Sequence, residues 1–134
     1  MRINPFELIY RYIYPAVRRR LAEILYYDEG LNQRQIAEIL GVTQSAVSRY
    51  VDGYRGMLVD FKDYPEINNE LRKLAKKIVS NKIDKYIVQV EIAYIIFRSL
   101  ARKRLCSLHL KVDPTIDYSK CNICPMLFKP FVEG

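Results

Sequence analysis

Four side chains near the C-terminus have the chemistry and the spacing of a metal site. Cys106 and His109 are separated by two residues, and so are Cys121 and Cys124, with eleven residues between the two pairs. Thiolates and imidazoles are ligands that zinc prefers, and two such pairs can each span one edge of a tetrahedron. We therefore predict a closed Cys3His site, with a structural or electronic role instead of a hydrolytic one.

These residue types leave the identity of the metal open. Zinc is the default for a Cys3His set, but an iron–sulfur cluster also accepts three thiolates and one imidazole. Pro125 follows Cys124, as a proline follows a ferredoxin ligand. Three buried thiols and a hydrogen-bonded histidine without metal are a third alternative. Zinc would make the tail a folding or dimer element, whereas a cluster would make the protein a redox or oxygen sensor.

A second constellation lies in residues 33–51, which have the spacing of a helix-turn-helix motif. Ala37 is small where two helices must cross closely, and Gly41 permits the left-handed turn between them. Thr43 can cap the second helix. The residues left on the outside of that helix are polar or basic, and no acidic residue occurs in residues 40–51. Because glutamine pairs with adenine and arginine with guanine, we predict that this helix reads double-stranded DNA in the major groove.

Three runs of the chain, residues 14–25, 31–50 and 53–56, resemble a known family. They look like the archaeal branch of Cro/repressor-type transcriptional regulators, and a similar module opens the archaeal regulators of thiamine biosynthesis. The resemblance covers about residues 5–60 and implies a repressor-like domain, with Arg55 near the DNA backbone. The chain is too short for the ligand-binding domain of the thiamine regulators, so thiamine phosphate sensing is not carried over. The candidate DNA-binding residues are Gln33, Thr43, Gln44, Ser45, Ser48, Arg49 and Arg55.

The elements that must position both sites are predicted to be helices. Asn4 and Pro5 should begin a first helix, Pro15 should break or kink it, and the next should stop at Gly30. Further helices are expected at about residues 32–40, 43–53, 66–80 and 82–105. We therefore predict an all-α fold, in which an N-terminal helix-turn-helix bundle is followed by long helices and a small Cys/His metal-bound tail.

The sequence divides into three parts on this reading. Residues 1–60 form the DNA-binding domain, residues 61–105 a helical dimerisation region, and residues 106–134 the metal-binding tail. The middle of the helix expected at residues 82–105 is apolar nearly all round, and such a helix is buried on every side. In a chain of 134 residues we expect one of those sides to face a second copy, so that the protein is a homodimer.

The charge balance is consistent with a polyanionic partner. The net charge is +7, and residues 61–110 alone carry 11 basic and 5 acidic side chains. The arginines at positions 18–20 and the basic face of residues 72–85 could touch phosphates, although such runs are more often solvated surface. No stretch is apolar enough to span a bilayer and no secretory signal is recognisable, so we expect a cytoplasmic protein without membrane association.

Three functions were compared on these observations. The leading one is a sequence-specific, dimeric transcription regulator with a metal site. The alternative is an architectural chromatin or nucleic-acid-binding protein with a structural zinc, which would show little preference among sequences. A third is an enzyme with a cysteine nucleophile, but no acidic partner or glycine-rich loop accompanies Cys106 and His109. We therefore expect no enzymatic activity.

Overall fold

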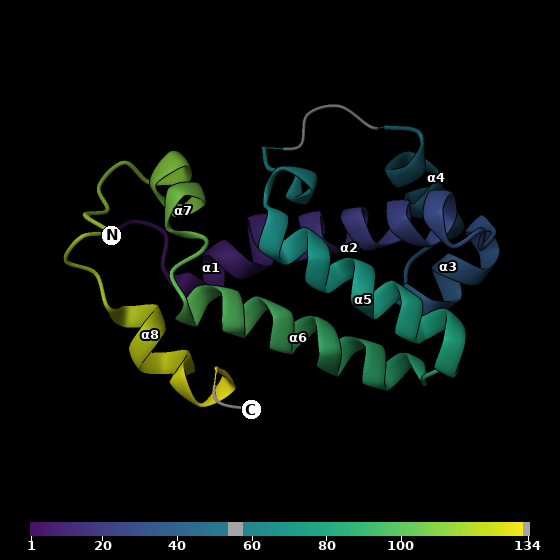
Figure 1. The fold of residues 1–134 in the computed structure, drawn as a ribbon. Helices are drawn as coiled ribbons and strands as arrows, with labels where there is room; N and C mark the ends of the chain where they lie inside the picture. Colours follow the sequence, from purple (N-terminus) through teal and green to yellow (C-terminus); the bar gives the residue numbers. More distant parts are fainter. Residues whose placement is uncertain (54–57, 133–134) are drawn as a thin grey trace.

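A computed structural model describes residues 1–53 and 58–132, and helices are the only regular secondary structure in those residues (Figure 1). The predicted all-α fold is therefore confirmed for this part of the chain. The first helical turns follow one another from Pro5 to Asp28 without an intervening loop. They are α1 (Pro5–Leu8), the π-helical turn η1 (Ile9–Ile13), α2 (Tyr14–Glu23) and a second π-helical turn, η2 (Ile24–Asp28).

Pro15 does not break this helical run, but the regular α-helix is interrupted before it and α2 begins next to it, as the prediction of a break or kink allowed. In η1, directly before Pro15, the amide of Tyr14 donates to the carbonyl of Ile9, five residues earlier instead of the usual four. Pro15 has no amide hydrogen and stands in the first turn of α2, where proline is tolerated. The wider turn thus accommodates the proline. The run ends at Gly30 as predicted, with a φ of 76°.

Two short helices, α3 (Gln33–Leu40) and α4 (Gln44–Val51), pack against each other, and α4 also packs across α2. Their shared interior contains Ile36, Leu40 and Val47, which are at most 2% exposed. Beyond residues 54–57, the 3-10 helix η3 (Phe61–Asp63) places Phe61 in the core with no exposed surface. This segment, expected to be irregular, therefore supplies one of the largest buried side chains of the molecule.

Two longer helices, α5 (Pro65–Asn81) and α6 (Lys85–Ala101), pack side by side (Figure 1). α6 is shorter than the predicted helix at residues 82–105. Asp84 sets its start, because its side chain accepts a hydrogen bond from the amide of Tyr86 at 2.7 Å. Lys103 follows its end with a left-handed φ of 57°. The apolar side chains of α6 are not all buried within this chain, since Ile87 and Val90 are exposed.

The tail holds more regular structure than its prolines suggested. It forms α7 (Cys106–Val112), α8 (Ile123–Phe128) and the 3-10 helix η4 (Lys129–Phe131). Phe128 is buried and stacks on Phe97 of α6, with ring centroids 4.8 Å apart. Leu108 of α7 is 1% exposed. Ordinary core packing therefore holds part of the tail, a contribution that the interrupted sequence pattern does not reveal.

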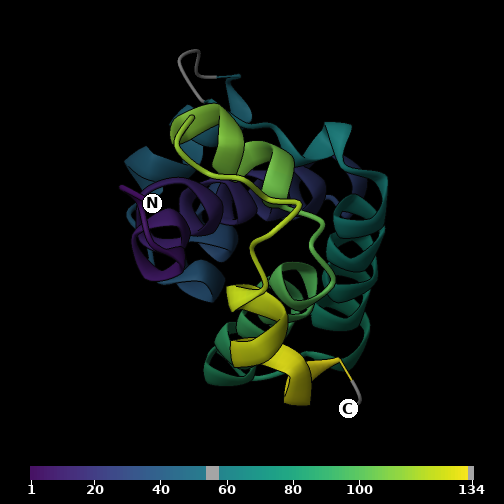
Figure 2. The ribbon, with the colours of Figure 1, turned by 90° about the vertical axis from the view of Figure 1, so that its left-hand side faces the viewer.

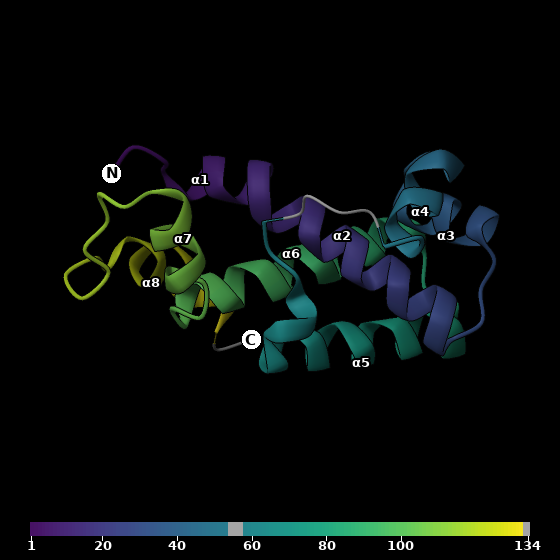
Figure 3. The ribbon, with the colours of Figure 1, turned by 90° about the horizontal axis from the view of Figure 1, so that it is seen from above.

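One hydrophobic core runs from Leu8 in α1 to Phe128 in α8. α3 and α4 lie at one end of the molecule, and α7, α8 and the N-terminus lie at the other (Figures 1 and 3). Figure 2 faces the second end, where α7 lies in front of the first helical run. The division at residues 60 and 105 is not tested by this arrangement and stays a prediction. None of the helices in the described residues is long and apolar enough to cross a membrane.

Candidate nucleic-acid interface and metal centre

The first turn of α4 presents most of the predicted base-reading side chains to solvent. Gln44, Ser45 and Arg49 are exposed. Ser48 is half-buried, and its hydroxyl donates to the carboxylate of Asp52 at 3.2 Å. Residues three and four apart lie on the same side of a helix, so positions 44, 45, 48 and 49 form one continuous polar face. The structure therefore brings together four of the residues predicted from the sequence.

The turn that precedes α4 fixes the direction of this face. Gly41 has a φ of 69°, in the left-handed region, and an added Cβ would meet no atom within 4 Å. The hydroxyl of Thr43 accepts the amide hydrogen of Ala46 at 3.1 Å, which confirms the predicted cap. Because that hydroxyl only accepts in the cap, its O–H and the free amides of the first turn can still donate to a phosphate. Gln33, the first residue of α3, is half-buried.

Two tyrosines and one glutamine hold the motif in place, and the sequence analysis did not identify them. The phenol of Tyr27 in η2 donates to the carbonyl of Val51 at the end of α4. The phenol of Tyr14 donates to the side-chain oxygen of Gln89 at 2.6 Å, and Nε2 of Gln89 reaches the carbonyl of Leu40 at 3.5 Å. These partners lie far apart in the sequence, so no local pattern could have shown them.

The arginines at positions 18–20 mainly contact other residues of the protein and present little free surface. Arg20 is 9% exposed, and its Nε donates to the side chain of Asn68 at 2.7 Å. Arg19 lies 3.9 Å from a carboxylate oxygen of Glu23. Burial raises the pKa of Glu23, and the neighbouring Arg19 and Arg20 oppose that rise. Arg18 stacks over a tyrosine ring, 4.6 Å from its centroid. Arg20 is thus unavailable for the phosphate contact considered from the sequence.

The second basic face, on α5, is partly neutralised within the protein. Three of its cations pair with carboxylates of η2, of the turn after η2 and of α6. The pairs are Arg72–Asp28 at 2.8 Å, Lys76–Glu29 at 3.8 Å and Lys77–Glu91 at 3.2 Å. Such exposed pairs contribute little to stability, but they reduce the positive charge that a nucleic-acid backbone would meet. This face is therefore a weaker candidate for binding than α4.

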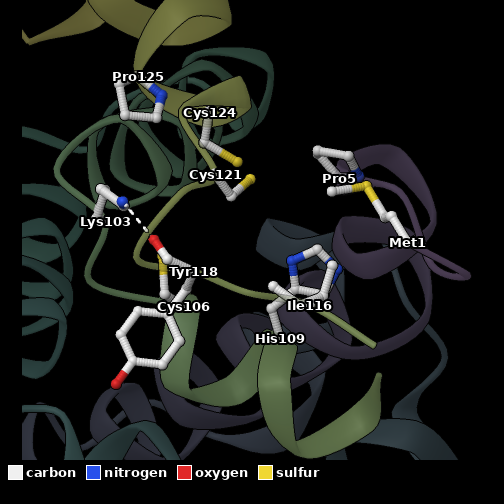
Figure 4. Close-up of a pocket in the computed structure, with 10 residues that line it drawn as sticks. All are labelled: Met1, Pro5, Lys103, Cys106, His109, Ile116, Tyr118, Cys121, Cys124 and Pro125. Atoms are coloured by element: carbon white, nitrogen blue, oxygen red, sulfur yellow. Dashed lines mark hydrogen bonds between the residues drawn. The ribbon is translucent and has the colours of Figure 1, made fainter. Parts of the chain in front are cut away.

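The four predicted metal ligands line one cavity at the opposite end of the molecule (Figure 4). Cys106 and His109 lie one turn apart on α7, Cys124 lies in α8, and Cys121 precedes α8. The cavity has a volume of about 20 Å³, which is enough for one water-sized particle. All three cysteines are free and half-buried. In residues 1–53 and 58–132, no three His, Cys, Asp or Glu side chains are close enough to coordinate one ion as they stand.

Two of the thiols, those of Cys106 and Cys124, lie in an environment that disfavours their charged form. Burial raises the pKa of Cys106. Burial, with the neighbouring thiols of Cys106 and Cys121, raises the pKa of Cys124 to about 11. Lys103 opposes both shifts, and its Nζ donates to the carbonyl of Tyr118 at 2.7 Å. Without a cation beside them, the thiols of Cys106 and Cys124 are expected to be protonated at neutral pH.

The N-terminal segment is attached to this cavity by contacts that the sequence did not predict. The carboxylate of Asp113 accepts the backbone amides of Arg2 at 2.6 Å and Ile3 at 2.9 Å. Hydrogen bonds from the hydroxyl of Thr115 and from these amides hold the pKa of Asp113 well below its ordinary range. Nε2 of His109 lies 2.5 Å from the carbonyl oxygen of Ile3. The cavity is therefore bounded by the N-terminal segment as well as by the tail.

The comparison with protein families bears on the first of these two sites. Residues 14–57 match the family model described as a homeodomain-like domain. The matched region includes α2, η2, α3 and α4. These residues form a helix-turn-helix module. The matched range also contains Arg55, which lies outside the described residues. Comparisons with curated proteins and with solved structures gave no significant match. The narrower resemblance to archaeal Cro/repressor-type regulators stays a prediction.

Proposed function

We propose that this protein binds specific DNA sequences and regulates transcription, in the manner of the Cro/repressor-type regulators that residues 5–60 resemble. The observation that carries the proposal is the polar face of α4, where Gln44, Ser45 and Arg49 are exposed at the start of the second helix of a helix-turn-helix module. In such modules the second helix enters the major groove and its N-terminal residues contact base edges. This function makes the protein a binding protein instead of an enzyme.

Each side chain of this face has a separate role in the proposal. Gln44 would pair with adenine and Arg49 with guanine, whereas Ser45 tolerates several bases. Ser48 already donates to Asp52, so it would accept a hydrogen bond or contact the sugar–phosphate backbone. Thr43 and Gln33 stand at the starts of their helices, where amides and side chains meet phosphates. Arg55 is assigned to the DNA backbone by the family resemblance alone.

The experiment is a selection of binding sites from random double-stranded DNA, followed by titration of the selected site and scrambled sites. Gln44→Ala and Arg49→Ala should each cost about 1–3 kcal/mol at the position they read and should relax preference there. Arg102→Ala removes an exposed arginine at the other end of the molecule and is the matched control. If both α4 variants keep the preference of the wild type, the regulator proposal is wrong.

The alternative, an architectural nucleic-acid-binding protein, makes the opposite prediction. It requires a basic surface that follows the phosphate backbone and gives steep salt dependence with little sequence preference. The ion pairs of α5 weaken that surface, as described above. Equal affinity for the selected and scrambled sites at every salt concentration would support the architectural role.

We further propose that the regulator acts as a homodimer through the exposed side of α6. Four apolar or aromatic side chains lie exposed on this helix at spacings that place them on one side. They are Tyr86, Ile87, Val90 and Tyr94. A dimer would place two α4 helices on half-sites about one DNA turn apart. Sedimentation should show a dimer at micromolar concentration for the wild type and a monomer for Val90→Arg. A monomeric wild type would contradict the dimer.

The regulator is also proposed to carry a metal on the ligands of the tail. The metal is zinc in the leading form of the proposal and an iron–sulfur cluster in the alternative, in which the protein would sense redox state or oxygen. The residues fit a metal in type and spacing, because three thiols and one imidazole line a single cavity. As described, these side chains must move closer together before they can share an ion.

A further inference from the structure

We propose that the tail cavity binds one mononuclear zinc(II) ion, with Nδ1 of the histidine as ligand and its Nε2–H fixed on the backbone of the N-terminal segment. The four ligands are Cys106, His109, Cys121 and Cys124. This inference rests on the metal proposed above, and it excludes the iron–sulfur alternative. It also assigns a role to residues 1–3, which belong to neither pair of ligands.

The hydrogen bond of His109 determines which ring nitrogen can bind the ion. A backbone carbonyl only accepts hydrogen bonds, so Nε2, which lies 2.5 Å from the carbonyl oxygen of Ile3, must carry the proton. In the neutral ring Nδ1 then has the free lone pair. Figure 4 shows one ring nitrogen on the side of Met1 and Pro5 and the other on the side of the thiols. Metal-bound histidines usually donate their second N–H in this way, which fixes the ring and its tautomer.

The size of the cavity distinguishes a single ion from a cluster. A volume of about 20 Å³ accommodates one water-sized particle, and a zinc ion is no larger than that. An iron–sulfur cluster brings several iron and sulfide atoms, which together take far more space than one water-sized particle. A single zinc ion requires the ligands to move inward, since Zn–S bonds are about 2.3 Å long. Cys121 lies between α7 and α8 and belongs to neither helix, so an inward movement of this residue disrupts no helix.

The charge of the surroundings also suits one zinc ion. Binding converts three thiols into thiolates and releases three protons, while the imidazole stays neutral. The charges of Zn²⁺ and three thiolates leave the site with one net negative charge. Lys103 lines the same cavity and supplies one positive charge. The positive charge of the ion therefore balances most of the negative charge of the thiolates, which burial otherwise disfavours. Lys103 balances the one negative charge that remains.

The N-terminal segment holds the histidine ligand in position without contacting the ion itself. Asp113 accepts the amides of Arg2 and Ile3, and this positions the carbonyl of Ile3 against His109. Asp113 is thus a positioning residue and not a ligand. Losing an outer-shell partner of a metal-bound histidine typically lowers metal affinity about 10–100-fold. The same loss is expected here when the segment is released.

The test measures zinc, iron and acid-labile sulfide on the full chain, purified without oxygen and in the absence of DNA. We expect close to one zinc per chain and neither iron nor sulfide. The cobalt(II)-substituted protein should show the visible absorption of a tetrahedral ion with thiolate ligands. Iron with sulfide, or a chain that neither retains nor rebinds zinc, would overturn the proposal. Because no DNA is present, this outcome is independent of whether α4 binds DNA.

Variants of the full chain then test each ligand and the support. His109→Ala and Cys121→Ser should each weaken zinc at least 100-fold in competition with a chromogenic chelator, whereas Ser107→Ala, an exposed neighbour on α7, should match the wild type. Asp113→Ala should weaken zinc about tenfold, and Asp113→Asn provides a milder change if the first variant does not fold. Unchanged zinc affinity in His109→Ala, or in both Asp113 variants when folded, contradicts the assigned geometry.

Discussion

Asp113 is 1% exposed although its side chain is charged, and it has hydrogen-bond partners on several sides. Its carboxylate accepts the amides of Arg2 and Ile3, together with the amide and hydroxyl of Thr115. A buried charge persists only where such partners replace water. At the scale of residues, this carboxylate ties the beginning of the chain to the tail.

The pH dependence of stability follows from these partners. The folded-state pKa of Asp113 lies well below the ordinary value of about 3.9. Ionised Asp113 therefore stabilises the fold above that ordinary value, and the contribution is lost as the pH falls below it toward the folded-state pKa. We expect Asp113→Asn to lower the urea midpoint at pH 6 and to reduce its change between pH 6 and pH 3. Parallel curves for the two proteins would contradict this assignment.

Replacing Gly41 should reduce stability through backbone conformation alone. Its φ is 69°, and an added Cβ would meet no atom within 4 Å, so steric conflict with neighbours plays no part. Gly41→Ala should lower the free energy of unfolding by about 1–2 kcal/mol, the cost of a left-handed L-residue. Asparagine adopts that conformation more readily, so Gly41→Asn should lose less. Equal losses in urea titration would indicate a different cause.

At the scale of elements, local signals predicted the helices that begin and end with caps. Gly41 and Thr43 have strong intrinsic preferences, and the structure ends α3 and begins α4 where these residues indicated. The structure adds a capping box of Asn32 and Gln35 at the start of α3. The prediction was less accurate where no capping residue marks the boundary. The turn before Pro15 is π-helical, and α6 ends early, before a left-handed lysine, Lys103. No hydrophobic period in the sequence encodes either feature.

The short helix η3 contributes a large buried side chain to the core. Phe61 has no exposed surface and packs edge-on against Tyr64, with ring centroids 5.3 Å apart. We expect Phe61→Ala to cost about 3–5 kcal/mol of unfolding free energy, since it removes a large buried ring and leaves a cavity. Phe6→Ala changes a ring that is 65% exposed and should cost far less. Similar losses for both variants would show that Phe61 is not a core residue.

At the scale of the whole molecule, the two sites lie at opposite ends of one core (Figures 1 and 3). Any effect of the metal on DNA binding must therefore pass through packed helices or through the dimer. α6 is the most direct connection, because it packs against α8 at one end and α3 at the other. Within one chain, the predicted metal ligands therefore lie far from the polar face of α4 that is proposed to read DNA.

This separation predicts how a metal-free variant binds DNA. His109→Ala should lower thermal stability, because zinc bound to the folded state stabilises it. It should leave the ratio of affinities for selected and mutated sites unchanged, since the base-reading side chains lie on α4. Anisotropy titrations with both DNA molecules measure this ratio. A ratio that changes severalfold would mean that the metal reorients α4 itself.

Local spacing in the sequence was enough to predict the candidate metal-binding and DNA-binding residues and the helices on which they lie. The two Cys/His pairs, the polar face of α4 and its caps depend on local spacing, which a single sequence displays. Long-range contacts instead place the four predicted ligands around one cavity with Met1 and Pro5, and bury Arg20 against Asn68 where it cannot face phosphates. The physical reason is that these outcomes depend on contacts between segments far apart in the chain, which arise when the core forms and leave no periodic pattern in the sequence.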